Sequence, residues 1–286
     1  GVAGTSLGNR RPSNRDMQRI LRLGKKDPNL PVQDETSRFS KSDRYTLRPI
    51  QSQALATIRT VRGLFAQMGV GWGKTIISLL APEALRQSGL AVSRSLLLVP
   101  APLVEKTENE RYALSPHLKT DNTMRVMSYS AFSVPSATDL LERLRPDLIV
   151  CDEAHKIARK DSSRARRLMR YARSNPDCRF VFLSGSFTTT SVKEYAHLLE
   201  LVLGNNTPLP REFPVLKSWA AVLDPEGKPK AEDYATIRPL LSHYGLSTEN
   251  FREAARDAYR TRLRETEGVV STSDTSLDSR LVLREH

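Results

Sequence analysis

Gly69-Val70-Gly71-Trp72-Gly73-Lys74-Thr75 is the stretch that decides the fold. A short apolar run, Leu64 to Met68, precedes it, and a helical pattern, Thr75 to Leu80, follows it. Glycines let the backbone fold so that successive N–H groups point at phosphate oxygens, and the helix N-terminus adds a partial positive charge. Lys74 can then reach the β- and γ-phosphates of a nucleotide, and the Thr75 hydroxyl is placed to bind Mg²⁺. The stretch predicts a strand, a phosphate-binding loop and a helix in succession.

Two features of this loop depart from the simplest expectation. The strict pattern Gly-x-x-x-x-Gly-Lys-Thr has glycine where Met68 stands, and an ordinary glycine-rich turn is the alternative interpretation. Pro82 follows soon after the loop. Because proline inside a helix removes a backbone hydrogen bond, we expect the helix after the loop to be short or kinked.

Outward from the loop, the chain alternates short apolar strands with helical stretches. Three strands are nearly continuous in apolar residues, as strands buried on both faces of a parallel sheet must be: Ser95 to Pro100, Asp147 to Cys151 and Arg179 to Leu183. Arg125 to Tyr129 is a shorter and more polar candidate. The alternation predicts an α/β fold with a doubly wound, mostly parallel sheet, in which ligands lie at the carboxyl ends of the strands.

A pair of carboxylates follows one of these strands. Asp152-Glu153-Ala154-His155 comes directly after Asp147 to Cys151. Beside a phosphate-binding loop, one carboxylate can hold the water shell of Mg²⁺ and a second can orient an attacking water, so we assign Asp152 to Mg²⁺ and Glu153 to the water. A helix N-cap with an acidic first turn is the structural alternative.

The next strand ends in a small turn rich in hydroxyl groups, Ser184-Gly185-Ser186. We expect His155 to hydrogen-bond to Ser184 or Ser186 and so to connect hydrolysis to movement. Ordinary turn chemistry and a structural histidine are the alternatives.

Composition bounds the class of protein. The chain has 286 residues, 39% of them hydrophobic, and no stretch approaches the roughly 20 uncharged apolar residues of a membrane span. Its 44 Lys and Arg exceed its 32 Asp and Glu, and the net charge of +12 makes a polyanion the expected partner, nucleic acid before membrane. Cys151 and Cys178 provide neither a disulfide framework nor a zinc site, and Gly1 to Arg10 lacks the apolar core of a secretory signal. These features favour an intracellular protein.

Changes in composition divide the chain into three parts. Residues 1–45 are rich in Arg and Lys, with one amphipathic run near Met17 to Leu23, and predict a basic, partly flexible arm; a solvated tail is the alternative. Residues 46–204 hold the predicted strands and helices of one lobe. Residues 205–286 begin with a Pro-rich loop and continue as helical pieces, the last from about Asn250 to Glu265, whereas residues 266–286 show no clear period.

Five motifs follow one another along the chain: Leu47-Arg48-Pro49-Ile50-Gln51, Gly71-Trp72-Gly73-Lys74-Thr75, Val99-Pro100-Ala101, Asp152-Glu153-Ala154-His155 and Ser184-Gly185-Ser186. In this order they resemble the motifs of the DEAH-type nucleic-acid-dependent ATPases of helicase superfamily 2. The resemblance covers residues 47–203 and implies a RecA-like lobe that binds ATP and Mg²⁺. It implies that Arg48 and Gln51 lie on the adenine side, that the second and fourth motifs are the Walker A and Walker B motifs, and that the fifth couples ATP hydrolysis to movement.

A finer resemblance lies in the Walker B motif and the residues that follow it. Residues 152–168 look more like the Swi/Snf-type translocases of double-stranded DNA than like the DEAD-box RNA helicases, and they are similar to a bacteriophage version. Ser184-Gly185-Ser186-Phe187 differs from the Thr-Gly-Thr-Pro that such motors usually carry.

Two regions are candidates for nucleic-acid contact. Pro100 with Ala101, and Ser128 with Tyr129, resemble strand-contacting motifs of the family, where backbone N–H and hydroxyl groups bind phosphates; ordinary strand-to-helix loops are the alternative. Between Lys156 and Arg173, eight basic residues face one acid, Asp161. Helical spacing predicts a buried face of Ala165, Leu168, Met169 and Ala172, which would leave the arginines outward, for phosphate contact or as a solvated face. The arginines assigned to DNA are Arg164, Arg166, Arg167 and Arg170.

The resemblance also implies a partner lobe. Motors of this family have two RecA-like lobes, and arginines of a Gln-x-x-Gly-Arg-x-x-Arg type motif in the second lobe complete the ATP site. No Gly-Arg dipeptide occurs in this chain. We therefore expect residues 205–286 to lead to a second lobe in a longer protein, and we expect the isolated chain to hydrolyse ATP weakly or not at all.

The favoured function is an ATP-driven motor lobe acting on DNA, with duplex DNA preferred. The motifs are compatible with RNA as well. A nucleic-acid-binding scaffold without turnover is one alternative, and the intact Lys74, Asp152 and Glu153 argue against it. Another viral P-loop DNA motor is a second alternative, and Gln51 upstream of the loop disfavours it. The expected location is the cytoplasm, that of the host for a phage protein, or the nucleus for a eukaryotic one.

Overall fold

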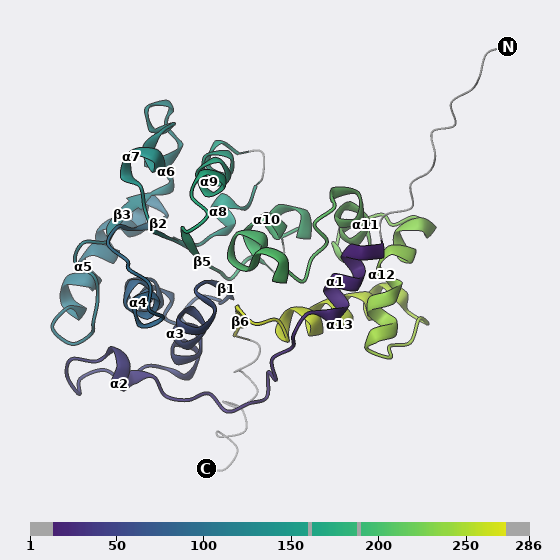
Figure 1. Ribbon diagram of the computed structural model, residues 1–286, viewed down its shortest axis with the longest axis horizontal. Helices are drawn as coiled ribbons and strands as arrows, with labels where there is room; N and C mark the ends of the chain where they lie inside the picture. The colour runs from purple at the N-terminus through teal and green to yellow at the C-terminus, as the bar shows by residue number, and fades with distance from the viewer. Residues whose placement is uncertain (1–13, 160–161, 188–189, 273–286) are drawn as a thin grey trace.

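A six-stranded sheet, in which every neighbouring pair of strands is parallel, forms the centre of the molecule. The computed structural model describes residues 14–159, 162–187 and 190–272 (Figure 1). The strands are β1 (Leu64–Gln67), β2 (Ser95–Val99), β3 (Arg125–Ser128), β4 (Leu148–Asp152), β5 (Arg179–Ser184) and β6 (Val269–Ser271), in the order β3-β2-β4-β5-β1-β6. The predicted α/β fold is confirmed, and each strand expected from an apolar run is present.

Alternate side chains of the strands enter two separate cores, one on each face of the sheet. In β1, Leu64 and Ala66 pack with α3 (Pro49–Val61) and α4 (Lys74–Gln87). Phe65, between them, packs on the other face with side chains of α9 (Ser163–Ser174) and α10 (Val192–Leu203). Burial on both faces explains why these strands lack the alternation of apolar and polar residues typical of an exposed sheet.

The helix after the phosphate-binding loop is longer than the sequence suggested. α4 continues through Pro82 to Gln87, so the expectation of a short helix is wrong. Most residues on both sides of Pro82, from Ile77 to Leu85, are buried in the core. Burial of that apolar surface offsets the roughly 3 kcal/mol that an internal proline costs a helix.

Short helices connect the remaining strands of the lobe. They are α5 (Val104–Leu114) between β2 and β3, then α6 (Tyr129–Ser133) and α7 (Leu140–Leu144) between β3 and β4, and α8 (His155–Ala158) after β4. Short 3₁₀ turns lie at Ala101–Leu103, Pro135–Ala137 and Gly204–Asn206. No helix in the described part of the chain is long and apolar enough to cross a membrane.

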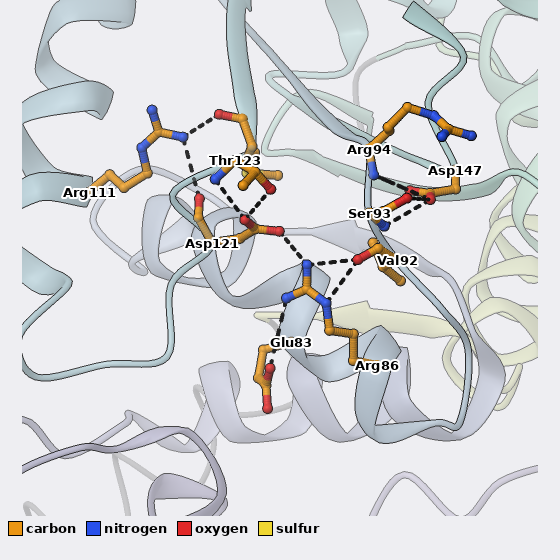
Figure 2. Close-up of polar contacts among 10 residues, drawn as sticks. Glu83, Arg86, Val92, Ser93, Arg94, Arg111, Asp121, Thr123 and Asp147 are labelled. Atoms are coloured by element: carbon orange, nitrogen blue, oxygen red, sulfur yellow. Dashed lines mark hydrogen bonds and ion pairs between the residues drawn. The ribbon is translucent and has the colours of Figure 1, made fainter.

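Arginines form polar contacts with the segments that lead into the amino ends of β2, β3 and β4 (Figure 2). Arg86, near the end of α4, donates from Nε and Nη2 to the carbonyl of Val92 at 3.0 and 2.9 Å and pairs with Asp121. Burial alone would raise the pKa of Asp121, but hydrogen bonds from Thr123 and Arg86 lower it below its usual value. Some of the chain's arginines are therefore engaged in contacts within the protein.

The predicted helical C-terminal region is present and returns to the sheet. It contains α11 (Phe213–Leu223), α12 (Ala231–His243) and α13 (Phe251–Arg264), which lie to one side of the sheet in Figure 1. After α13 the chain forms β6, whose Val269 pairs with Phe65 of β1. We did not predict β6, because three residues of a short edge strand carry no recognisable period.

The described part of the predicted basic arm packs on the molecule at both ends. α1 (Asn14–Arg22) contacts α12, and the segment then runs beneath the lobe to α2 (Thr36–Phe39) (Figure 1). Phe39 is fully buried, and Arg59 of α3 donates two hydrogen bonds to Glu35, at 2.8 and 2.9 Å. These bonds hold the pKa of Glu35 below its usual value. Residues 1–13 of the arm lie outside the described residues.

Candidate nucleotide site

Three motif loops meet at one edge of the sheet because their strands are neighbours. β4, β5 and β1 lie side by side. Gln67 at the end of β1 pairs with Ser184 of β5. Asp152 at the end of β4 pairs with Leu183 of β5. The loops that follow these parallel strands therefore start at the same level of the same edge, as expected for a ligand site in an open α/β sheet.

Gly185 brings the loop after β5 against the start of the phosphate-binding loop. A β-carbon on Gly185 would lie 3.0 Å from the Cα of Gly69 and 3.0 Å from the carbonyl oxygen of Met68. The two loops are also tied by the backbone N–H of Met68, which donates to the carbonyl of Ser184 at 3.0 Å. A glycine at residue 185 is what allows this close backbone approach.

Lys74 and Glu153 face each other across the site. Lys74 begins α4, and its ammonium group forms an ion pair with the Glu153 carboxylate. The side chain of Lys74 is only 10% exposed and that of Glu153 is 24% exposed, so the pair is largely shielded from water. The two residues that the sequence assigned to phosphate and to the attacking water therefore lie in contact.

Asp152 is a buried carboxylate at the end of β4. It is 7% exposed, and its Oδ1 accepts a hydrogen bond from the backbone N–H of Glu153 at 2.9 Å. Burial raises the pKa of Asp152 to about 6, although the positive charge of Lys74 opposes the rise. A nearby cation would favour the ionised form, which makes the position suitable for a metal ligand.

The residues present fit a magnesium ion bound together with a nucleotide. Asp152 and the half-buried Thr75 offer the oxygen ligands that Mg²⁺ prefers, and one carboxylate suffices where phosphates and waters complete the coordination. Among the described residues, no cluster of three or more His, Cys, Asp or Glu could hold a metal ion without such help. Cys151 and Cys178 are both buried and free.

Gln51 and Arg48 contact the phosphate-binding loop from α3. Gln51 is 3% exposed; its Nε2 donates to the carbonyl of Gly73 at 3.2 Å. Arg48 donates from Nη1 to the carbonyl of Gly71 at 2.5 Å. Gly73 has a φ of +80°, and a β-carbon there would lie 2.2 Å from the Gln51 amide nitrogen. The glutamine segment and the loop are thus packed as one unit.

The expected contact between His155 and the turn after β5 is present. His155 Nδ1 lies 2.9 Å from the hydroxyl oxygen of Ser184 and 3.4 Å from a carboxylate oxygen of Glu153. The Ser184 hydroxyl also accepts from the backbone N–H of Ser186 at 3.1 Å. Burial lowers the pKa of His155, although the Glu153 carboxylate raises it in part. A neutral His155 therefore bridges the Walker B turn and the loop after β5.

The two loops predicted to contact nucleic acid differ in exposure. Ala101 is exposed and Pro100 is half-buried at the end of β2. Ser128 accepts from the backbone N–H of Ala131 at 3.0 Å and so caps α6. Tyr129, in contrast, is 2% exposed, and its hydroxyl donates to the backbone carbonyl of Asp152 at 2.6 Å. The side chain of Tyr129 therefore faces the core beneath the Walker B turn.

The arginines of α9 do not all point outward, which corrects the sequence prediction. Arg167 donates to the carbonyls of Phe132 and Val134 at 2.6 and 2.9 Å, because the segment 132–142 lies directly against α9. Arg164 and Arg170 bind the same segment, at Ser133 and Glu142. Arg166 is exposed, with no side-chain partner among the described residues. Phosphate contact by these arginines stays a prediction.

The buried face of α9 also differs in part from the predicted one. Ala165 and Leu168 are buried as expected, whereas Met169 and Ala172 are half-buried and Tyr171 is buried instead. Lys160 and Asp161, which belong to the predicted basic stretch, lie outside the described residues.

No sequence pattern predicts the link between Tyr129 and Asp152. The two residues are 23 positions apart and belong to different elements. A tyrosine near a strand end has no pattern that indicates a hydrogen bond to a backbone carbonyl elsewhere.

Comparisons with known proteins found one family match and several matches among solved structures. Residues 44–184 match the model of the family described as type III restriction enzyme, res subunit. No curated protein matches the chain. Among solved structures, 46 chains match. One is the Sulfolobus solfataricus SWI2/SNF2 ATPase core in complex with dsDNA, at 16% identity and a TM-score of 0.47, with 75% of this chain and 46% of that chain covered.

This chain thus spans less than half the length of that solved chain. The family match covers the phosphate-binding loop, the Asp152–His155 stretch and all five strands from β1 to β5. Residues 44–184 are therefore similar to the type III restriction enzyme res-subunit family and resemble the DEAD/H-like N-terminal domain of superfamily 2 helicases.

Proposed function

We propose that this chain carries the first, ATP-hydrolysing lobe of a motor that moves on DNA. The observation that carries the proposal is the contact between Lys74 and Glu153 beside the buried Asp152. A phosphate-binding lysine, a water-orienting carboxylate and a metal-binding carboxylate are the groups that phosphoryl transfer to water requires. A scaffold that only holds a nucleotide has no use for Glu153 at this place.

Each residue of the site has a proposed role. Backbone N–H groups of Gly71 to Thr75 and the Lys74 ammonium bind the phosphates, and Gln51 with Arg48 orients the base. When bound, Mg²⁺ neutralises charge on the phosphates, and Thr75 and Asp152 would hold it. Glu153 accepts a hydrogen bond from the attacking water and aligns it with the terminal phosphorus.

DNA is the proposed track because the chain is strongly basic and part of that charge is exposed. The net charge is +12, and Arg166 projects from α9 into solvent. Backbone groups around Ala101 and Ser128 would contact phosphates without reading bases. The proposal places the transition-state arginine in a second RecA-like lobe of the full-length protein, and residues 46–204, to whose sheet β6 adds a strand, form the first lobe.

Removal of Lys74 tests the nucleotide site. In the full-length protein, Lys74→Ala should lower DNA-stimulated ATP hydrolysis by about a hundredfold or more, because the charge that stabilises the transferring phosphate is lost. Lys217→Ala, at an exposed lysine of α11, is the matched control and should hydrolyse ATP normally. Unchanged turnover in Lys74→Ala would refute the proposed site.

Glu153→Gln should produce a different defect from Lys74→Ala. The glutamine keeps the size of the side chain but cannot accept the proton of the attacking water, so hydrolysis should fall by about a hundredfold while Mg·ATP still binds. Equilibrium binding of a fluorescent ATP analogue separates the two variants. Equal loss of nucleotide affinity in both would contradict the division of roles.

A comparison of polymers tests the proposed track. We expect duplex DNA to stimulate phosphate release by the full-length protein more than single-stranded DNA or RNA of equal nucleotide concentration. Stronger stimulation by RNA would replace the DNA motor with an RNA-dependent one and leave the nucleotide site unaffected.

A further inference from the structure

The backbone of Glu153 has an unusual conformation. Its φ is +51°, in the left-handed region that residues other than glycine, asparagine and aspartate rarely adopt. Arg62 and Arg145 are the other described non-glycine residues with positive φ, and both end a helix, where that conformation is common. Glu153 instead follows a strand. A conformation that costs on the order of 1–3 kcal/mol persists at such a place only where neighbouring groups hold it.

Hydrogen bonds hold the peptides on both sides of Glu153. On the far side, the backbone N–H of Ala154 donates to the carbonyl of Leu183 at 2.9 Å. On the near side, the carbonyl of Asp152 accepts from the Tyr129 hydroxyl at 2.6 Å. That carbonyl belongs to the peptide whose orientation fixes φ of Glu153. The Tyr129 bond therefore acts directly on the strained torsion.

We propose that Tyr129 is a positioning residue: its hydroxyl fixes the Asp152–Glu153 peptide so that the Glu153 carboxylate faces Lys74 and the phosphate-binding loop. The inference rests on the proposed ATPase function and names a further residue of that site. Tyr129 touches neither phosphate nor water and acts through the backbone.

Tyr129 is itself well fixed, which a positioning residue requires. Its ring is 2% exposed and lies under the guanidinium of Arg164, with 5.6 Å from the guanidinium carbon to the ring centroid. The buried Tyr129 hydroxyl donates its hydrogen bond to the Asp152 carbonyl. Because Tyr129 begins α6 directly after Ser128, it also joins the proposed nucleic-acid loop to the Walker B turn.

Tyr129→Phe tests the proposal because it removes only the hydroxyl. In the full-length protein with saturating duplex DNA, we expect kcat for ATP hydrolysis to fall by about tenfold, since a small misplacement of a catalytic group has a large effect on rate. The KM for ATP and the affinity for an ATP analogue should change by less than about twofold, because Tyr129 binds the backbone carbonyl of Asp152 and not the carboxylate that would hold Mg²⁺.

Tyr171→Phe is the matched control. Tyr171 is also 2% exposed, and its hydroxyl donates to the backbone carbonyl of Pro146 at 2.5 Å, at the opposite end of β4. Each variant loses one buried hydrogen bond to a backbone carbonyl at one end of β4, but only the carbonyl of Asp152 lies beside Glu153. Wild-type kcat in Tyr129→Phe, or an equal fall in Tyr171→Phe, would overturn the proposal.

A measurement without ATP hydrolysis separates this inference from the proposed function. Hydrogen exchange at the backbone amides of Glu153 and Ala154 should be faster in Tyr129→Phe than in the wild type, and unchanged in Tyr171→Phe. If the wild-type protein hydrolyses no ATP, the proposed function fails and exchange alone decides the role of Tyr129. Unchanged exchange in Tyr129→Phe would refute that role.

Discussion

At the scale of single residues, Gly185 makes the closest backbone approach in the site. Replacement by alanine would place a methyl group 3.0 Å from two backbone atoms at the start of the phosphate-binding loop. Backbone atoms cannot swing aside as a flexible side chain can, so the loop itself must shift. We expect Gly185→Ala to weaken ATP-analogue binding by about tenfold, in line with the effect of small displacements of positioned groups.

Gly24→Ala is the control for this glycine replacement. A β-carbon on Gly24 would meet nothing within 4 Å, so its methyl group would extend into open space. Gly24→Ala should bind the nucleotide analogue normally. Normal binding by Gly185→Ala as well would show that the two loops can separate without consequence for the nucleotide.

At the same scale, sequence patterns predicted which residues gather but not how they are held. Lys74, Asp152 and His155 were placed at one sheet edge because each follows a buried strand or opens the helix after the loop. The left-handed backbone of Glu153 and the contact of Tyr129 with Asp152 were not foreseen. They depend on packing between segments distant in sequence, for which a single chain offers no local signal.

At the scale of elements, α9 uses neighbouring arginines in two ways. Arg167 makes hydrogen bonds to the segment 132–138, whereas Arg166 is exposed. We expect Arg167→Ala to lower the free energy of unfolding by about 1–2 kcal/mol, because it leaves carbonyls of that segment without a charged donor. Arg166→Ala should leave that free energy unchanged, within about 0.5 kcal/mol.

DNA binding should show the reverse ranking if the proposed interface is right. Removal of one phosphate contact at Arg166 should reduce the slope of log affinity against log salt by about 1, equally for unrelated sequences. Fluorescence anisotropy over a salt series measures this slope, and chemical denaturation measures stability. An unchanged slope for Arg166→Ala would make α9 a structural helix whose exposed Arg166 is only solvated.

Some helices and strands were predictable from the sequence and others were not. Strands β2, β4 and β5 are buried on both faces, so continuous apolar runs in the sequence predict them. β6 has only three residues and is held in place by its pairing with β1, so its own sequence shows no recognisable strand pattern. α4 continues through Pro82 because burial of its apolar residues outweighs the tendency of proline to end a helix. Local patterns therefore succeed where burial is complete and fail where a partner segment decides the structure.

At the scale of the whole molecule, the helices α11 to α13 are tied to the sheet in several ways. The chain leaves β5 through α10 and returns through α13 to β6 beside β1. The N-terminal segment adds a further link, because the backbone N–H of Lys26 donates to the carbonyl of Glu265 at 2.8 Å. Arg19 of α1 donates to the carbonyls of Thr207 and Leu209, at 2.5 and 2.8 Å. We therefore expect the lobe and its helical region to unfold together.

The two tryptophans of the chain allow a test of this cooperativity. Trp72 lies in the phosphate-binding loop, and Trp219, fully buried in α11, lies in the helical region. Trp72→Phe and Trp219→Phe each leave one reporter. Within each variant, the denaturation midpoint from tryptophan emission should coincide with that from far-UV circular dichroism, as a two-state transition requires. Arg19→Ala, added to either variant, should lower the free energy of unfolding by about 2 kcal/mol through both probes. A Trp219 transition that precedes the loss of circular dichroism would mean that the helical region unfolds separately, in spite of β6 and the N-terminal link.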